Sequence, residues 1–404
     1  MKKTAGFLLS VVLSAFICLS GCGSVSNPQS GSSSVSYHDI TKVGDHLYSI
    51  SYDAYNPTVA GAYLENLLGN AEAFSCSACR NGNFVGRNYD WTYDDNIEFV
   101  IQVSQTEGRH ASIGVAGCHS LLDLSAENVA SGKDLPDYAY LPFFTLDGIN
   151  DAGVYVSDNM VADGTMGQTS GTNPEGERLC AMAIPRFVLD NADSAEHAIA
   201  LLKEKNIYMP STEDYTEEIH FMIADPSRTY VVEFINNELT VLEGDNILTN
   251  FYLTGFDKSE QTLSDFPAGL ERYNILRDNY ALGSTEEGML ELMQSVRYSR
   301  YCDPTTVPFW YTEFCGDYRA DGLDLVLTAK DIGEPDLSQS LDGAGKFRDI
   351  IAAEIEGYQN KTRNGEYWIS THTSVYDLAQ KTLSIIAQEN GQVLKFDLDG
   401  NQIF

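Results

Sequence analysis

Residues 76–91 read CSACRNGNFVGRNYDW, two short β-like runs on either side of an Asn-Gly pair. Asn81-Gly82 between such runs predicts a β-hairpin, because a type I′ turn needs positive φ at both central positions. A two-residue turn there places Cys76 directly opposite Arg87, and opposed residues share a face with Cβ atoms about 5 Å apart. Cys79 then points to the other face. The stretch therefore predicts a thiol beside a cation on one face and a small core residue on the other.

A cysteine beside an arginine is, taken alone, also typical of a surface cross-strand pair, so the wider sequence has to decide. The run Cys-Ser-Ala followed by Gly-Arg-Asn-Tyr-Asp-Trp resembles the choloylglycine hydrolase family, which includes bile salt hydrolases and penicillin V acylases and is related to acid ceramidase. Further motifs resemble that family in the same order along the chain: 147–154 (DGINDAGV), 247–250 (ILTN), 271–273 (ERY) and 373–377 (TSVYD).

The resemblance implies an α+β fold, the αββα sandwich of N-terminal-nucleophile hydrolases with two antiparallel sheets. It also implies that cleavage after Ser75 exposes Cys76 as a nucleophile whose own freed α-amine is the general base. An α-amine with a pKa of roughly 7.7–8.0 suits that role near neutral pH. By the same resemblance, Arg87 holds the thiolate and Asp90 orients the α-ammonium.

Two more residues gain roles from the resemblance. Asn250 is expected to donate to the oxyanion, and Arg272 to support the site electrostatically. The position of the family's second oxyanion donor falls near Met160, one residue away from Asn159, which becomes the candidate donor. Covalent catalysis of this kind calls for no metal and no cofactor.

Composition narrows the classes of partner. The chain has 404 residues, 43% of them hydrophobic, and a formal charge of −33 from 58 acidic and 25 basic residues. That is enough apolar sequence for one large domain. We do not expect nucleic-acid binding, because contact with a phosphate backbone requires a stripe of basic residues. The expected partner is a small N-acyl amide, and a homo-oligomer is left open.

The N-terminus resembles a bacterial lipoprotein signal. Two lysines precede an apolar run at 5–19, which closes on Leu-Ser-Gly and Cys22. We expect a signal peptide at 1–21 and a Ser-rich tether at 22–36 that begins with lipidated Cys22, so that the protein is anchored by lipid to the cell membrane outside the cytoplasm. An ordinary signal peptide with an incidental cysteine is the alternative reading.

Cleavage after Ser75 would separate this anchor from the nucleophile. Residues 37–75 contain strand-like and helix-like segments with apolar faces, so we expect either a propeptide or a retained light chain, followed by one catalytic domain at 76–404.

Runs of strands with helices between them predict α+β with largely antiparallel sheets. The expected strands lie at 47–52, 74–79, 84–89, 97–103, 153–157, 219–223, 229–235, 239–242, 247–250, 373–378, 383–388 and 393–396. The expected helices lie at 58–68, 178–189, 195–205 (opened by Ser194), 270–280, 286–296 and 347–358. A turn is expected at 147–151.

Two other functions remain open. One is a non-catalytic surface lipoprotein on the same fold that binds small acylated ligands. The other is a conventional cysteine hydrolase that uses Cys79 or Cys118 with a histidine. His110 and His119 are more typical of surface or hydrogen-bonded histidines.

Several finer questions stay open from sequence alone. Cys118 and Cys180 are expected to be small core residues, and a disulfide between Cys302 and Cys315 is undecided. The substrate is also undecided among conjugated bile salts, penicillin V and other N-acyl amides. The aromatic residues at 143–144 and 309–311 fit either an acyl pocket or the core.

Overall fold

The computed structural model describes residues 35–44, 46–57, 75–92, 97–117, 122, 124–161, 171–209, 218–256, 269–297, 299–302, 325–326, 366–387 and 392–404. The predicted signal peptide, Cys22, the helices at 58–68 and 347–358, Cys118, His119, Cys315 and the aromatic residues at 309–311 lie outside these ranges. In the part of the chain that is described, no helix has the length and apolar character needed to span a membrane.

Nine strands form one sheet, called sheet A here. Their order across the described sheet is β1 (Ser36–Gly44), β2 (Leu47–Ala54), β5 (Glu98–Val103), β6 (Ser112–Gly117), β7 (Thr145–Asn150), β8 (Tyr155–Val161), β11 (Glu218–Ala224), β12 (Thr229–Ile235) and β13 (Glu238–Glu243). Neighbouring strands are antiparallel except β2 and β5, which run parallel. Between β2 and β5 the chain forms β3 and β4 of the other sheet, which gives the long crossover that a parallel pair requires.

The second sheet, sheet B, contains the predicted hairpin and is antiparallel throughout its described pairs. Its order is β14 (Ile247–Leu248), β3 (Ser75–Asn81), β4 (Phe84–Thr92), β17 (Glu366–Asp377), β15 (Ser299–Cys302) and β16 (Leu325–Val326), while β18 (Thr382–Ala387) also pairs with β17, and β19 (Val393–Phe396) pairs with β18. A separate parallel pair joins β9 (Arg178–Cys180) to β10 (Asn206–Tyr208).

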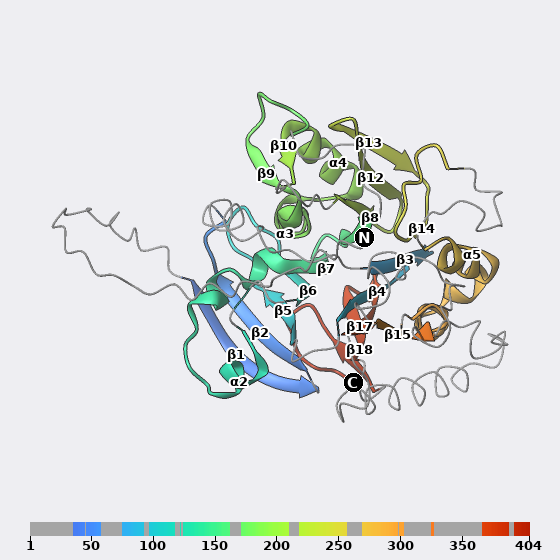
Figure 1. Cartoon of the computed structure of the whole chain (residues 1–404). Helices are drawn as coiled ribbons and strands as arrows, with labels where there is room; N and C mark the ends of the chain where they lie inside the picture. The colour runs from blue at the N-terminus through green and yellow to red at the C-terminus, as the bar shows by residue number, and fades with distance from the viewer. Residues whose placement is uncertain are drawn as a thin grey trace, which may run out of the picture. The chain divides into compact units, whose positions relative to one another are not determined.

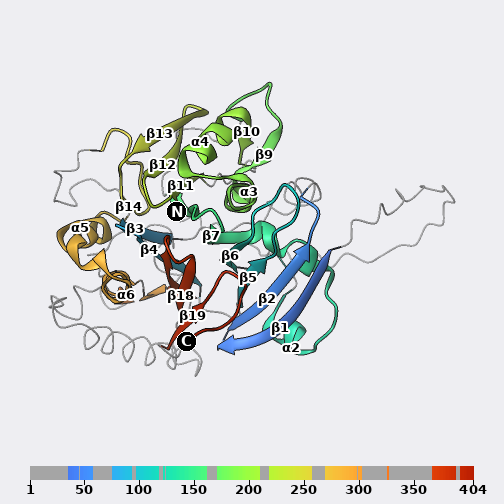
Figure 2. The same ribbon diagram turned by 180° about the vertical axis from the view of Figure 1, so that it is seen from behind.

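Helices cover the outer faces of the two sheets. On one side α3 (Ile184–Asn191) contacts β7 and β8, and α4 (Ala195–Glu204) contacts β11 of sheet A. On the other, α5 (Leu270–Asp278) contacts β14 and β3, and α6 (Glu286–Gln294) contacts β4 and β17 of sheet B. Figures 1 and 2 show these two helix pairs beside their respective sheets. The order helix, sheet, sheet, helix confirms the expected αββα sandwich.

Shorter helical segments complete the described chain. They are α2 (Ala126–Ala130) and the 3-10 turns η3 (Pro136–Ala139), η4 (Leu141–Phe144), η5 (Ala181–Ala183) and η6 (Tyr280–Ser284).

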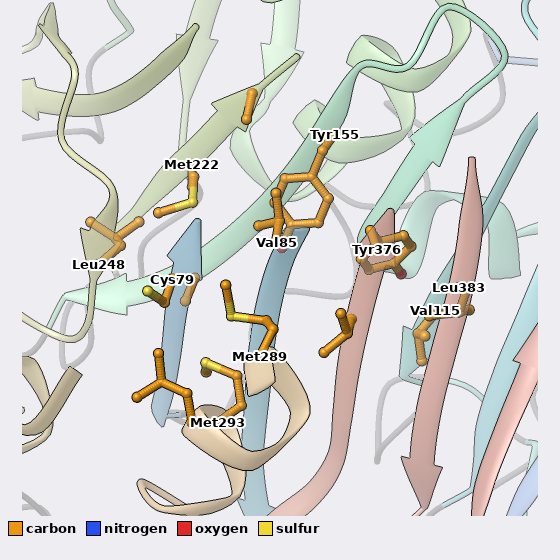
Figure 3. Packing of buried hydrophobic residues seen from close by; sticks show 14 of the residues in the cluster. Cys79, Val85, Val115, Tyr155, Met222, Leu248, Met289, Met293, Tyr376 and Leu383 are labelled. Carbon is orange, nitrogen blue, oxygen red and sulfur yellow. The ribbon is translucent and has the colours of Figure 1, made fainter. Parts of the chain in front are cut away.

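Apolar side chains fill the spaces between the layers. Between the sheets, the rings of Tyr155 on β8 and Tyr376 on β17 lie 5.1 Å apart. Between sheet B and α6, Figure 3 shows Cys79 beside Met289 and Met293. Burial of such side chains contributes about 1.5–3 kcal/mol each, and it fixes which face of the hairpin meets sheet A.

Most predicted strands are confirmed, and the differences have local causes. The predicted turn at 147–151 is wrong up to residue 150, which ends β7. Gly148 lies inside that strand. A Cβ added there would lie 2.7 Å from Leu189 of α3, so the glycine allows close packing between strand and helix. The predicted helix at 178–189 begins as strand β9, and β1 starts at Ser36, inside the predicted tether. The sheets are largely antiparallel, as expected, and β2–β5 is the one parallel pair among the described strands of sheet A.

The helix at 195–205 forms as its cap predicts. The side chain of Ser194 accepts a hydrogen bond from the backbone N–H of His197, which satisfies one of the free donors at the start of α4. The helix then ends at Glu204.

Candidate active site

The β3–β4 hairpin turns at a different residue pair from the predicted one. Asn81 pairs with Phe84, so the two turn residues are Gly82 and Asn83. Of these two, only Gly82 has a positive φ, 61°, which is the pattern of a type II′ turn with glycine in the first central position. The predicted type I′ turn at Asn81-Gly82 is therefore wrong.

This displacement moves each cross-strand partner by two residues. Cys76 pairs with Tyr89 rather than Arg87, and Arg87 pairs with Ala78. Because side chains alternate between faces with a period of two, a two-residue shift leaves each residue on its predicted face. Arg87 consequently lies diagonally across from Cys76, and its Nη2 donates to the Cys76 Sγ at 3.3 Å. The predicted contact forms without the predicted pairing.

Arg87 also binds two carboxylates of sheet A. Its Nη1 donates to Oδ2 of Asp147 on β7 at 2.8 Å. Its Nη2 donates to Oδ1 and to the backbone carbonyl of Asp158 on β8, at 2.7 and 2.6 Å. A planar guanidinium can serve several acceptors in fixed directions in this way, whereas a lysine could not. Arg87 therefore joins the two sheets at the thiol.

Burial and charge act in opposite directions on these groups. Burial raises the pKa of the Cys76 thiol to about 12 in the uncleaved chain, although Arg87 acts to lower it. Burial also raises the pKa of Asp158, to about 7, against the effect of Arg87. For Asp147, burial is outweighed by His372 and Arg87, which hold its pKa at about 2. Arg87 thus acts to lower the pKa of the Cys76 thiol, but its charge is shared with two carboxylates.

Asn250 approaches Cys76 from the other neighbour of β3. Ile247 and Leu248 of β14 pair with Cys79 and Ala78. Continuing that antiparallel register by two residues sets Asn250 opposite Cys76. The backbone N–H of Cys76, the nitrogen that cleavage would convert into an α-amine, donates to the Asn250 Oδ1 at 3.4 Å.

Arg272 reaches the same amide from helix α5. Its Nη2 donates to the Asn250 Oδ1 and its Nη1 to Oδ2 of Asp90, each at 2.5 Å. The start of α5 lies against the Asn250 segment, because Gly269 has a φ of 78° and an added Cβ there would lie 2.9 Å from Thr249. Only glycine allows this close approach, which brings Arg272 to the site.

Asp90 is held by two donors on the α5 side of sheet B. Besides Arg272, the hydroxyl of Ser370 on β17 donates to its Oδ1. Asp90 is the cross-strand partner of Ser75, so its backbone flanks the predicted cleavage site. In the uncleaved chain the Cys76 nitrogen donates to Asn250, and the predicted contact between Asp90 and the α-ammonium concerns the cleaved form.

Asn159 on β8 is fully buried. Within the described residues neither its Oδ1 nor its Nδ2 has a hydrogen-bond partner. The next carbonyl along the strand, that of Met160, accepts from the Asn250 Nδ2 at 2.9 Å. An unpaired buried amide costs free energy, so a ligand or water at this place would stabilise it.

Sheet A also holds the segment around Asn250. The Nε2 of His220 on β11 lies 2.9 Å from the backbone carbonyl of Thr249, and its Nδ1 lies 3.4 Å from the carboxylate of Glu233. That carboxylate accepts from the backbone N–H of Leu253 at 2.6 Å. His220 and Glu233 therefore fix the chain on both sides of Asn250.

Sequence reasoning missed several buried charged residues around the site, and gave Asp147 no role although it lies in a quoted motif. The missed residues are Glu98, Asp158, His220, Glu233 and His372, all at most 5% exposed. A charged residue inside an otherwise apolar strand was the available signal, because an isolated buried charge is costly and needs a partner.

The alternative candidates lie elsewhere. Cys79 is buried among apolar side chains between β3 and α6, and burial raises the pKa of its thiol. Cys180 is buried, as predicted. The ring nitrogens of His110 lie within hydrogen-bond distance of Asp151 and Asp193. Phe143 and Phe144 are buried in the core, which supports the core reading of that pair. No group of metal-binding side chains occurs in the described ranges.

Residues 76–266 match the sequence model of the linear amide C–N hydrolases of the choloylglycine hydrolase family. No curated protein matches the chain.

Among solved structures, the fold is similar to a mutant of the conjugated bile acid hydrolase from Clostridium perfringens, with 16% identity, a TM-score of 0.41 and coverage of 81% of this chain and 94% of that one. It is also similar to the penicillin V acylase from Agrobacterium tumefaciens, with 15% identity, a TM-score of 0.39 and coverage of 81% and 93%.

The family match begins at the residue that Arg87 contacts and includes Arg87, Asp90 and Asn250. Over residues 76–266, this chain is similar to the linear amide C–N hydrolases of the choloylglycine hydrolase family.

Proposed function

We propose that this protein hydrolyses the amide bond of an N-acyl substrate through a thioester on Cys76, after cleavage of the Ser75–Cys76 bond. One observation carries the proposal. The Cys76 Sγ lies 3.3 Å from the Arg87 guanidinium, and the nitrogen of the same residue lies 3.4 Å from the Asn250 amide oxygen. A nucleophile and its built-in base would therefore share one anchored residue.

Acylation would proceed with the α-amine as base. The amine takes the thiol proton, and the sulfur attacks the substrate carbonyl to give a tetrahedral oxyanion. The C–N bond then breaks, the α-ammonium returns its proton to the leaving amine, and an acyl thioester remains on Cys76. Water, deprotonated by the same α-amine, attacks the thioester and releases the carboxylic acid. The cycle regenerates the thiol without a metal or cofactor.

Cleavage would also change the charge around the sulfur. The peptide nitrogen of Cys76 becomes an amine that can carry a positive charge next to Sγ. Arg87 then no longer acts alone against burial in favouring the thiolate. We assign Asp90 the role of orienting that ammonium, because Arg272 links its carboxylate to Asn250, the current partner of the Cys76 nitrogen.

The oxyanion would be bound by two amides. The Asn250 Nδ2 donates to the Met160 carbonyl, while its Oδ1 accepts from Arg272, and we assign Nδ2 as the first donor. We assign the second donor to Asn159, whose buried amide has no hydrogen-bond partner within the described residues. Preorganised donors of this type contribute roughly 10²–10³ to kcat.

The segment before Cys76 would stay bound as a light chain. Its strands β1 and β2 extend sheet A at β5, as Figures 1 and 2 show. Leu47, Ile50 and Tyr52 of β2 are buried, and the Tyr52 hydroxyl donates to the backbone carbonyl of Tyr138 at 2.7 Å. Each buried side chain contributes about 1.5–3 kcal/mol to holding the segment. A lipid on Cys22 would then anchor the cleaved enzyme to the membrane outside the cytoplasm.

Activity assays on the Cys76→Ala and Cys79→Ala variants test the function. The substrates are conjugated bile salts, penicillin V and other N-acyl amides, the classes on which relatives act. We expect Cys76→Ala to abolish turnover and Cys79→Ala to retain it, because Cys79 packs in the core. Turnover in Cys76→Ala would exclude the proposal. Binding of acylated ligands with no turnover of any would favour the non-catalytic lipoprotein instead.

Native and denaturing electrophoresis test the light chain. The active protein should run as one species natively and as a small and a large fragment after denaturation. An active enzyme that lacks the small fragment, or an uncut active chain, would contradict retention.

A further inference from the structure

We propose that His372 is a positioning residue for the thiol: held as an imidazolium between Glu98 and Asp147, it keeps Asp147 from drawing Arg87 away from Cys76. This inference rests on the proposed function, since it concerns the reactivity of the same thiol. His372 lies on β17, Glu98 begins β5 and Asp147 lies on β7.

With both acids ionised, the geometry calls for a doubly protonated ring. The Nδ1 of His372 lies 2.9 Å from Oε2 of Glu98, and its Nε2 lies 3.3 Å from Oδ2 of Asp147. Carboxylate oxygens only accept hydrogen bonds, so each nitrogen must carry a hydrogen. A neutral imidazole would point a lone pair at one of the two carboxylates. Burial lowers the pKa of His372, but Glu98 and Asp147 outweigh burial and raise it to about 9.

The ring cannot easily turn away from this position. His372 is fully buried and stacks on the ring of Tyr89, with centroids 5.6 Å apart and an interplanar angle of 23°. Glu98 is itself fixed, because the hydroxyl of Thr371 donates to its Oε1 at 2.5 Å. The more distant Asp158 adds a further negative charge facing this cluster.

Asp147 connects His372 to the nucleophile. The oxygen of Asp147 that faces His372, Oδ2, is the one that accepts from the Arg87 Nη1 at 2.8 Å. The hydroxyls of Tyr376 and Ser374 donate to the other oxygen, Oδ1. His372 and Arg87 therefore contact the same oxygen of Asp147. A positive charge on His372 weakens the electrostatic attraction between Asp147 and the Arg87 guanidinium. Without it, the potential at the Cys76 Sγ becomes more negative and the thiolate is less favoured.

Charge-changing variants separate this role from a structural one. The measurement is the pH dependence of iodoacetamide alkylation in the processed protein, read by mass spectrometry on the peptide that begins at Cys76. His372→Gln should shift that profile to higher pH by about one unit. At a pH below the thiol pKa, this shift makes the alkylation rate about tenfold lower. His372→Asn, which also replaces the imidazolium by a neutral amide, should shift the profile in the same direction.

A control variant tests whether any loss of a buried histidine would suffice. His220→Gln replaces an equally buried histidine that faces Glu233 and a backbone carbonyl. Its alkylation profile should not move, even if turnover falls through Asn250. A shift as large as that of His372→Gln would overturn the proposal, and so would an unmoved profile in His372→Gln.

Folding failure does not block the test. If His372→Gln does not fold, His372→Asn decides alone: a shift to higher pH supports the proposal, and an unmoved or lowered profile overturns it. Failure of the proposed function looks different. An uncleaved Ser75–Cys76 bond in active protein, or turnover in Cys76→Ala, removes the nucleophile itself. If the enzyme needs Cys76 but the alkylation profile of the His372 variant does not move, only the role of His372 is excluded.

Discussion

The Oδ1 of Asn250 accepts hydrogen bonds from two groups, the Arg272 guanidinium and the backbone N–H of Cys76. Because both groups are donors, the atom that they contact must be the amide oxygen. The Nδ2 therefore lies on the opposite side and donates to the Met160 carbonyl. Arg272 thereby sets the orientation that an oxyanion donor needs, although its own charge is directed at Asp90.

Asn250→Ala is expected to lower kcat by roughly 10²–10³ with a small change in KM, because an oxyanion donor acts mainly in the transition state. Steady-state kinetics on the best substrate measure both constants. Asn250→Asp should be at least as impaired, since it sets a carboxylate where negative charge develops. A rise in KM at unchanged kcat would show that Asn250 binds the ground state instead.

Arg87→Lys is expected to raise the thiol pKa by about one unit or more, because one ammonium cannot replace the forked contacts to Sγ, Asp147 and Asp158. The pH profile of kcat/KM measures the shift. Asp158→Asn should lower the thiol pKa, since the carboxylate of Asp158 raises the pKa of Cys76. A lysine variant with the wild-type profile would contradict the role of Arg87.

Gly82→Ala should destabilise the fold by about 1–2 kcal/mol, the cost of the left-handed region for a residue with a Cβ. Nothing lies within 4 Å of the added Cβ, so the effect is conformational and not steric. Urea unfolding measures it. Asn83→Ala, at the next and exposed position, is the control and should change stability by less than about 0.5 kcal/mol. Equal effects at the two sites would refute the type II′ turn.

Stability should depend on pH through His372. Its pKa is raised from 6.5 unfolded to about 9 folded, so its contribution is fully present below pH 6.5 and is lost as pH rises through about 9. The difference in unfolding free energy between wild type and His372→Gln should therefore be largest below pH 6.5 and shrink above it. Urea titrations at several pH values measure this difference, and one that grows with pH would contradict the imidazolium.

The contact between Cys76 and Arg87 could be predicted because it depends only on alternation along two strands. The exact pairing could not, because Asn81-Gly82 and Gly82-Asn83 are both good turn formers and local preference does not choose between them. The error was harmless here since it shifted the register by two. A one-residue shift would have put the two side chains on opposite faces.

The support of the site could not be read from local pattern. His372 meets Glu98 across 274 positions, and Arg87 meets Asp158 across 71, so these pairs follow from how the sheets stack. Asp147 was read as a turn residue because Asp-Gly and Asn-Asp are typical of turns. Pairing with β6 and β8 makes this segment a strand instead.

The most direct test of the central claim is to trap the acyl-enzyme. Active protein is mixed with substrate, quenched in acid and digested, and the peptide that contains Cys76 is weighed. We predict a peptide that begins at Cys76 and carries the mass of the acyl group as a thioester. An acyl group on another residue, or turnover by protein in which Ser75 is still joined to Cys76, would contradict the account.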